Sequence, residues 1–151
     1  MKIVAIGNSI MGDDGIALKI VEKIEEELKG MEIEIIIGET DFEYCLRNIE
    51  DNDFVLILDS AHFGKKIGTI TLFSLEDFNF PIMHTSSQHE LSLLHMIKKY
   101  RKNVRGFVIG IEVNQVDFAF TLSDEMFVCL GQISKEVLNE IKKIREGVQD
   151  A

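Results

Sequence analysis

The sequence predicts an α/β fold, a three-layer α/β/α sandwich around a five-stranded, mostly parallel sheet. Short runs of β-branched and aliphatic residues alternate along the chain with segments whose apolar residues recur at steps of three and four. Several of the short runs are continuously apolar, which is typical of strands covered by helices on both faces. We find no internal repeat and no linker rich in Pro, Gly or Ser, so residues 1–151 are expected to form a single domain.

Five apolar or weakly alternating runs are expected to be the strands. They are residues 2–7, 32–38, 53–59, 68–74 and 104–113. The third run is the clearest, because five consecutive apolar residues precede an acid, Asp59. The segment 75–86 contains the only proline, Pro81, and is expected to be a long loop.

Four segments with helical periodicity are expected to cover the sheet. They are residues 14–29, 41–49, 87–102 and a last helix that starts at Ser123. Ser87 with Glu90 three residues later predicts a capping box, and Ser123 is followed by two acids that favour a helix N-terminus. The last helix has an apolar stripe that should face the core, formed by Met126, Leu130, Ile133, Val137, Ile141 and Ile144.

Composition excludes several classes of function. The formal net charge of −10 and the pI of about 4.8 disfavour nucleic acid as a partner. No apolar run approaches the roughly 20 residues needed to cross a bilayer. The first residues resemble a short signal sequence, but Asn8 and the pair Asp13-Asp14 follow at once and no cleavage site appears, so a cytoplasmic protein is expected. Cys45 and Cys129 are expected to be small hydrophobic residues without a function.

The candidate functional residues follow the apolar runs, because open α/β sheets bind ligands at the carboxyl ends of their strands. A glycine-framed acidic pair, Asp13-Asp14, follows the first run, where its charge would repel a phosphate. Asp59 ends the third run, and His89 stands in the first turn of the third helix. Taken singly, one acid of the pair could cap a helix, Asp59 could form an Asx turn, and His89 could be a surface residue.

Taken together, Asp14, Asp59 and His89 form a set of oxygen and nitrogen ligands of the kind that divalent nickel, zinc or iron accepts. Three protein ligands leave coordination positions open, which is typical of a reactive metal site. The sequence therefore predicts a metal site at one end of the sheet.

These motifs resemble those of the hydrogenase maturation endopeptidases. Residues 7–15 are similar to that family's opening motif, in which Gly-Asn is followed by two acids and glycine. Residues 55–61 resemble its apolar strand that ends in Asp and a small residue, and residues 87–91 resemble its Ser-x-His segment. Residues 110–112 and 122–123 are similar to its Gly-Ile strand and its Leu-Ser cap. The resemblance extends over nearly the whole chain.

The resemblance implies a cytoplasmic protease, monomeric, that removes the C-terminal extension of a hydrogenase large-subunit precursor. Nickel already inserted into the precursor would be the recognition mark, supplied by the substrate and bound only weakly by the free enzyme. The family's functional positions fall on Asp14, Asp59 and His89, as both metal ligands and catalytic residues. The family's sheet is mixed, so one strand should run antiparallel.

One segment departs from the family pattern. Where the family often has Gly-Thr-x-Gly, residues 39–42 read Glu-Thr-Asp-Phe, so the loop beside the site is expected to differ. Two other functions compete with the peptidase. A phosphoacceptor receiver domain would need a lysine after the fifth strand, where residues 112–114 read Glu-Val-Asn. A non-catalytic nickel-recognising chaperone would use the same three residues, and hydrolysis itself could be metal-assisted or carboxylate-driven.

Overall fold

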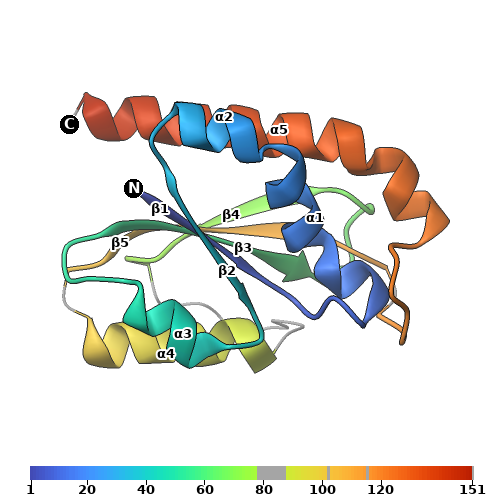
Figure 1. Cartoon of the computed structure of the whole chain (residues 1–151), viewed down its shortest axis with the longest axis horizontal. Coiled ribbons are helices and arrows are strands. Elements are labelled where there is room, and N and C mark those ends of the chain that lie inside the picture. The colour runs from blue at the N-terminus through green and yellow to red at the C-terminus, as the bar shows by residue number, and fades with distance from the viewer. Residues whose placement is uncertain (78–87, 102, 115, 151) are drawn as a thin grey trace.

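The computed structural model describes residues 1–77, 88–101, 103–114 and 116–150, without the side chains of residues 88–92. The described strands form one sheet in the order β2-β1-β3-β5-β4 (Figure 1). Their bounds are Lys2–Ile6 (β1), Glu34–Glu39 (β2), Phe54–Ala61 (β3), Ile70–Ser74 (β4) and Arg105–Glu112 (β5). The pairs among β2, β1, β3 and β5 are parallel, and β4 runs antiparallel to β5. The expected five-stranded, mostly parallel sheet is confirmed, and so is its one antiparallel strand.

Helices cover both faces of this sheet (Figure 1). The 3-10 helix η1 (Gly12–Gly15) leads into α1 (Ile16–Lys23), which with α2 (Glu25–Gly30) and α5 (Asp124–Gln149) lies on one face. On the other face lie α3 (Phe42–Arg47) and α4 (Gln88–Tyr100). The single helix expected at residues 14–29 is two helices, α1 and α2. The segment 14–29 breaks at Ile24, whose backbone angles of −109° and 15° leave the helical region. The expected loop at 75–86 and the Ser87 cap lie mostly outside the described residues.

Two hydrophobic clusters, one on each face of the sheet, form the core between the sheet and its helices. One packs α1 and α5 on one face, and the stripe of α5 contributes to it as expected, with Leu130 and Ile144 only partly buried. The other packs α3 and α4 on the opposite face. Side chains of β3 alternate between the clusters, with Leu56 and Leu58 in the first and Val55 and Ile57 in the second. The same alternation puts Ser60 toward α1 and α5, and Asp59 toward α3 and α4.

The expectation for the cysteines agrees with their environment. Cys45 is buried and Cys129 is half-buried, and both are free thiols. A Cβ atom added at Gly38 would lie 2.2 Å from the Cys45 sulfur, so β2 and α3 approach closely only because residue 38 is glycine. Burial, with the nearby charge of Asp41, raises the pKa of Cys45 to about 11, so this thiol stays protonated.

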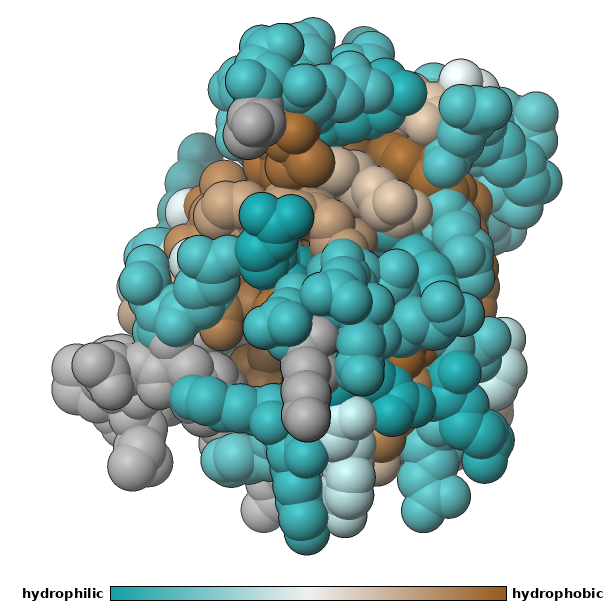
Figure 2. Space-filling view, turned by 90° about the vertical axis from the view of Figure 1, so that its left-hand side faces the viewer, coloured by the Kyte–Doolittle hydropathy of each residue, from teal (hydrophilic) through white to brown (hydrophobic). Residues whose placement is uncertain are grey.

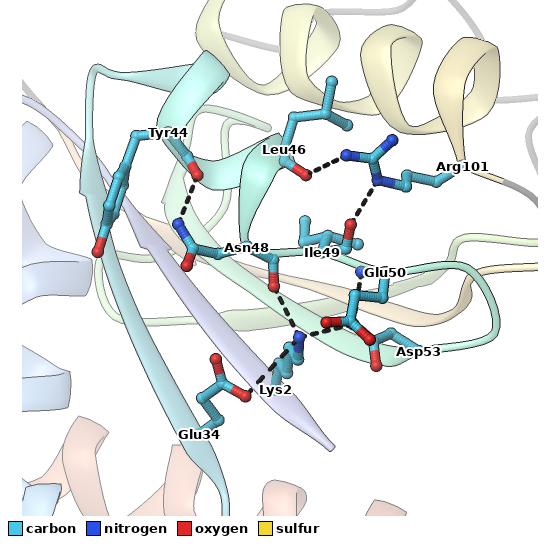
Figure 3. Close-up of polar contacts among 9 residues, drawn as sticks. All are labelled: Lys2, Glu34, Tyr44, Leu46, Asn48, Ile49, Glu50, Asp53 and Arg101. Atoms are coloured by element: carbon cyan, nitrogen blue, oxygen red, sulfur yellow. Dashed lines mark hydrogen bonds and ion pairs between the residues drawn. The ribbon is translucent and has the colours of Figure 1, made fainter.

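The four parallel strands begin at the end of the molecule opposite the candidate site, where the polar contacts are structural (Figure 3). Lys2 donates a hydrogen bond of 2.7 Å to the backbone oxygen of Asn48 and pairs with Asp53 at 3.0 Å. Burial alone would lower the pKa of Lys2, but the hydrogen bond and charge of Asp53, with Glu34 and Glu50, raise it. These contacts fix the start of β1 against the turn that precedes β3.

Arg101, just after α4, closes the C-terminal end of α3 (Figure 3). Its guanidinium donates to the backbone oxygens of Leu46, at 2.9 Å, and Ile49. Carbonyl groups at a helix C-terminus lack partners within the helix, so a cation there is stabilising. Viewed from this end, the molecule shows a band of hydrophobic residues between hydrophilic ones (Figure 2). Among the described helices, none is long and apolar enough to span a membrane.

Candidate active site

Asp14 and Asp59 lie where the neighbouring strands β1 and β3 finish. Asp14 lies in η1, directly after the loop that leaves β1, and is 7% exposed. Asp59 is 1% exposed and lies within β3. The expectation that the strand ends at Asp59 is wrong by two residues. β5 is long enough to continue the ladder, so Ser60 still pairs with Ile111 and Ala61 with Glu112.

Ser60 joins the two carboxylates. Its backbone N–H donates to Oδ1 of Asp59 at 2.8 Å, and its hydroxyl donates to Oδ1 of Asp14 at 2.7 Å. Ser60 is only 1% exposed, so these bonds form where water does not compete. Asp14 and Asp59 are thus each one hydrogen bond from Ser60, Asp14 through the serine hydroxyl and Asp59 through the serine backbone N–H.

The loop after β1 positions Asp14 by its backbone. The N–H of Asn8 donates to Oδ2 of Asp14 at 2.9 Å, so each carboxylate oxygen of Asp14 accepts one hydrogen bond. Gly7 has a φ of +148°, and a Cβ atom there would lie 2.2 Å from the backbone oxygen of Asp14. Only glycine permits this approach, which explains the first glycine of the opening motif.

Asp13 has a different task from Asp14. Oδ1 of Asp13 accepts the backbone N–H of Ser123 at 2.7 Å, and Oδ2 accepts the Ser123 hydroxyl at 2.8 Å. Ser123 is the N-cap of α5, as expected, and its hydroxyl accepts the N–H of Met126. No side-chain hydrogen bond caps η1 or α1, so the reading in which either acid caps its own helix is wrong. Asp13 instead ties the loop after β1 to the start of α5.

His89 lies in the first turn of α4, and its side chain is outside the described residues. Helix α4 begins at the end of the sheet where β3 finishes, on the face toward which Asp59 points (Figure 1). His84 is also outside the described residues. Whether His89 meets the two carboxylates therefore stays a prediction. Within the described part of the chain, no three or more His, Cys, Asp or Glu residues are grouped so that they could hold a metal ion.

Two residues of this region, Ser60 and Glu112, have contacts that the sequence pattern did not predict. Glu112 ends β5 and is 2% exposed. Its carboxylate oxygens accept the backbone N–H groups of Phe63 and Lys65 at 3.0 and 3.1 Å, which fixes the loop after β3. The signal that could have found it is an acid at the end of a buried apolar strand, because such an acid needs hydrogen-bond donors.

The described residues thus form a three-layer α/β/α domain with fixed, buried carboxylates at the strand ends, where folds of this kind bind ligands. The family model described as HycI, hydrogenase maturation protease, matches residues 18–146. The chain thus belongs to the hydrogenase maturation proteases. The predicted class, an endopeptidase that processes the C-terminus of a hydrogenase large subunit, is confirmed by this membership, and the receiver domain is excluded.

Individual relatives agree with this assignment. A protein of Methanocaldococcus jannaschii that bears the provisional name of hydrogenase maturation protease is 26% identical over 147 residues, which span 93% of this chain and 96% of that protein. The maturating endopeptidase HybD of E. coli has a similar structure, with a TM-score of 0.71, 19% identity and coverage of 95% and 93%. The [NiFe] hydrogenase maturation protease HybD of Thermococcus kodakarensis is also similar, with a TM-score of 0.67 and 21% identity. The match covers 95% of this chain and 97% of that protein. At these identities the two structures support the fold alone.

Proposed function

We propose that this endopeptidase removes the C-terminal extension of a hydrogenase large-subunit precursor that already contains nickel. Asp14, Asp59 and His89 bind the nickel ion of the precursor. This binding places the cleavage site at the end of the sheet where the three residues lie. The observation that supports this proposal best is the pair of bonds through which Ser60 holds Asp14 and Asp59. We also propose that the enzyme acts as a monomer in the cytoplasm.

The donor groups fit a metal ion held by the substrate. A carboxylate has about four lone-pair sites, and the hydrogen bonds at Asp14 use one on each oxygen, so both oxygens keep the capacity to bind a cation. Carboxylate oxygen and neutral imidazole nitrogen are ligands that divalent nickel accepts. The remaining ligands belong to the precursor, so the nickel is part of the substrate and the free protein should bind it weakly.

The fixed carboxylates serve recognition and hydrolysis differently. For recognition, a preorganised carboxylate loses little conformational freedom when it meets the ion, which favours the loaded precursor over the empty one. For hydrolysis, the same site can orient a peptide bond beside the ion or activate a water molecule through a carboxylate. Both routes need the Asp14 and Asp59 side chains held in place, which is what Ser60 and Asn8 do.

The test is incubation of the purified protein with a nickel-loaded precursor, followed by mass spectrometry of the large subunit. The proposal expects a product shortened at its C-terminus and a single released peptide. Binding of the loaded precursor without shortening would contradict the proposal and favour the nickel-recognising chaperone. No binding and no shortening would reject both.

A further inference from the structure

An exposed apolar patch lies beside the candidate site. Phe118 and Phe120 are 68% and 72% exposed, and their rings contact each other edge to face with centroids 5.4 Å apart. Ile10, on the loop after β1, is 42% exposed. We call Ile10, Phe118 and Phe120 the apolar rim. Single exposed hydrophobic residues are ordinary, but neighbouring aromatic residues that stay uncovered mark interaction surfaces.

The apolar rim is attached rigidly to the loop that carries Asp14. Ala119, between the two phenylalanines, donates its N–H to the backbone oxygen of Ile10 at 3.1 Å and accepts the N–H of Gly12 at 2.8 Å. Met11 and Ala119 form a parallel β-bridge. Asp13 then binds Ser123 at the other end of the same segment. The rim and the candidate site therefore belong to one hydrogen-bonded unit, at the end of the molecule where α1 and α5 begin (Figure 1).

The residues beside the apolar rim are acidic, which favours a partner with basic residues. No Lys, Arg or His occurs in residues 106–134 or 3–18, the two chain segments that contain the residues of the rim. Asp117, Asp124 and Glu125 are exposed beside it. A second copy of the chain would bring the same acids and a net charge of −10 against this surface, which disfavours self-association. A protein with an apolar patch edged by Lys or Arg is complementary.

We propose that the apolar rim is the docking surface for the body of the hydrogenase large-subunit precursor, outside its cleaved extension. This inference rests on the proposed function, because it takes the precursor as the protein whose nickel reaches Asp14. A substrate that meets Asp14 must lie against the loop from Asn8 to Gly15, and the rim is bonded to that loop. The rim supplies aromatic anchors that strengthen binding, and the carboxylates supply recognition of nickel.

The variant F118S/F120S removes both anchors, and Tyr100→Ser is its matched control. Tyr100 is 53% exposed at the far end of α4, away from the site. The double variant should weaken binding of the nickel-loaded precursor by about tenfold or more, as loss of aromatic anchors does. KM for cleavage should rise by a similar factor, while kcat at saturating precursor stays unchanged. Ile10→Ser, on the other loop, should raise KM independently. Thermal melting of all variants checks that they fold.

The outcomes separate this inference from the proposed function. If wild type cleaves the precursor and F118S/F120S has the same Kd and KM as wild type, the rim proposal is overturned and the proposed function stands. If wild type binds but does not cleave, the proposed function fails, and a weaker Kd for the double variant still supports the rim. A dimer in sedimentation that dissociates in F118S/F120S, with unchanged affinity for the precursor, would assign the rim to a second copy and overturn the proposal.

Discussion

The hydroxyl of Ser60 donates a hydrogen bond of 2.7 Å to Oδ1 of Asp14, a residue 46 positions away in the sequence. This bond connects the ends of two neighbouring parallel strands, and the backbone N–H of Ser60 extends the connection to Asp59. The serine side chain therefore acts on Asp14 alone, because the bond to Asp59 comes from the backbone. The arrangement makes Ser60 a positioning residue of the candidate site, and it can be tested separately from the acids.

Ser60→Ala should reduce processing by about 10- to 100-fold, the usual effect of removing a group that orients a metal ligand. It leaves a buried carboxylate oxygen without its donor, so unfolding free energy should fall by about 1–3 kcal/mol. Ser134→Ala is the matched control, because the described residues supply no hydrogen-bond partner to this buried hydroxyl. The control should keep full activity. Equal losses in both variants, measured by precursor cleavage and urea unfolding, would refute a positioning role.

Asp14→Asn should abolish processing and change stability by about 1 kcal/mol or less. The amide has nearly the shape of the carboxylate, so its oxygen can accept the Asn8 N–H while its NH₂ donates to the Ser60 hydroxyl. The negative charge that would meet the nickel is lost. Asp150→Asn, at the exposed end of α5, is the control and should behave as wild type. Normal cleavage by Asp14→Asn would remove Asp14 from the active site, and a collapsed fold would show that its role is structural.

Asp13→Ala should destabilise the fold, because it removes the acceptor of two hydrogen bonds at the start of α5. Loss of these two part-buried hydrogen bonds to a charged acceptor should lower the free energy of unfolding by about 1–3 kcal/mol. Asp117→Ala, on the exposed segment that follows β5, should change it by about 0.5 kcal/mol or less. Urea denaturation of both variants gives the comparison. Similar stability of Asp13→Ala and wild type would mean that the tie to Ser123 contributes little.

Glu39→Gly should stabilise the protein. Glu39 has a φ of +48°, in the left-handed region that favours glycine, and it stands where the family often has glycine. Relief of this strain should add up to about 1 kcal/mol of unfolding free energy. Glu43→Gly, in α3, is the opposite control and should cost about 1 kcal/mol, because glycine is unfavourable within a helix. A loss of stability in Glu39→Gly would indicate that the side chain makes a contact worth more than the strain.

The sequence was sufficient for the sheet and its helices because hydrophobic periodicity reports burial directly. The apolar run before Asp59 predicted β3, and the four-residue spacing from Met126 predicted the buried face of α5. It could not predict the tasks of Asp13 and Asp14. Asp13 finds its partner 110 residues away, and a glycine-framed acid beside a helix has the same local pattern whether it caps that helix or another. The Ser60 bridge also depends on strand order, which periodicity does not contain.

The departure at residue 39 has a backbone explanation. Glu39 has a left-handed backbone conformation that glycine would adopt without strain, and its carbonyl accepts the N–H of Gly7 at 3.0 Å. The loop beside the site therefore holds its hydrogen bond to β1 even though its side chains differ from the family pattern.

We propose above all that this peptidase recognises its precursor by the nickel ion that the precursor contains. The most direct test of this proposal compares initial cleavage rates of one precursor preparation before and after nickel insertion, with the protease first dialysed against a chelator. We expect cleavage of the nickel-loaded form only, and release of the ion from the protease once the extension has been removed. Cleavage of the nickel-free precursor at the same rate would contradict it.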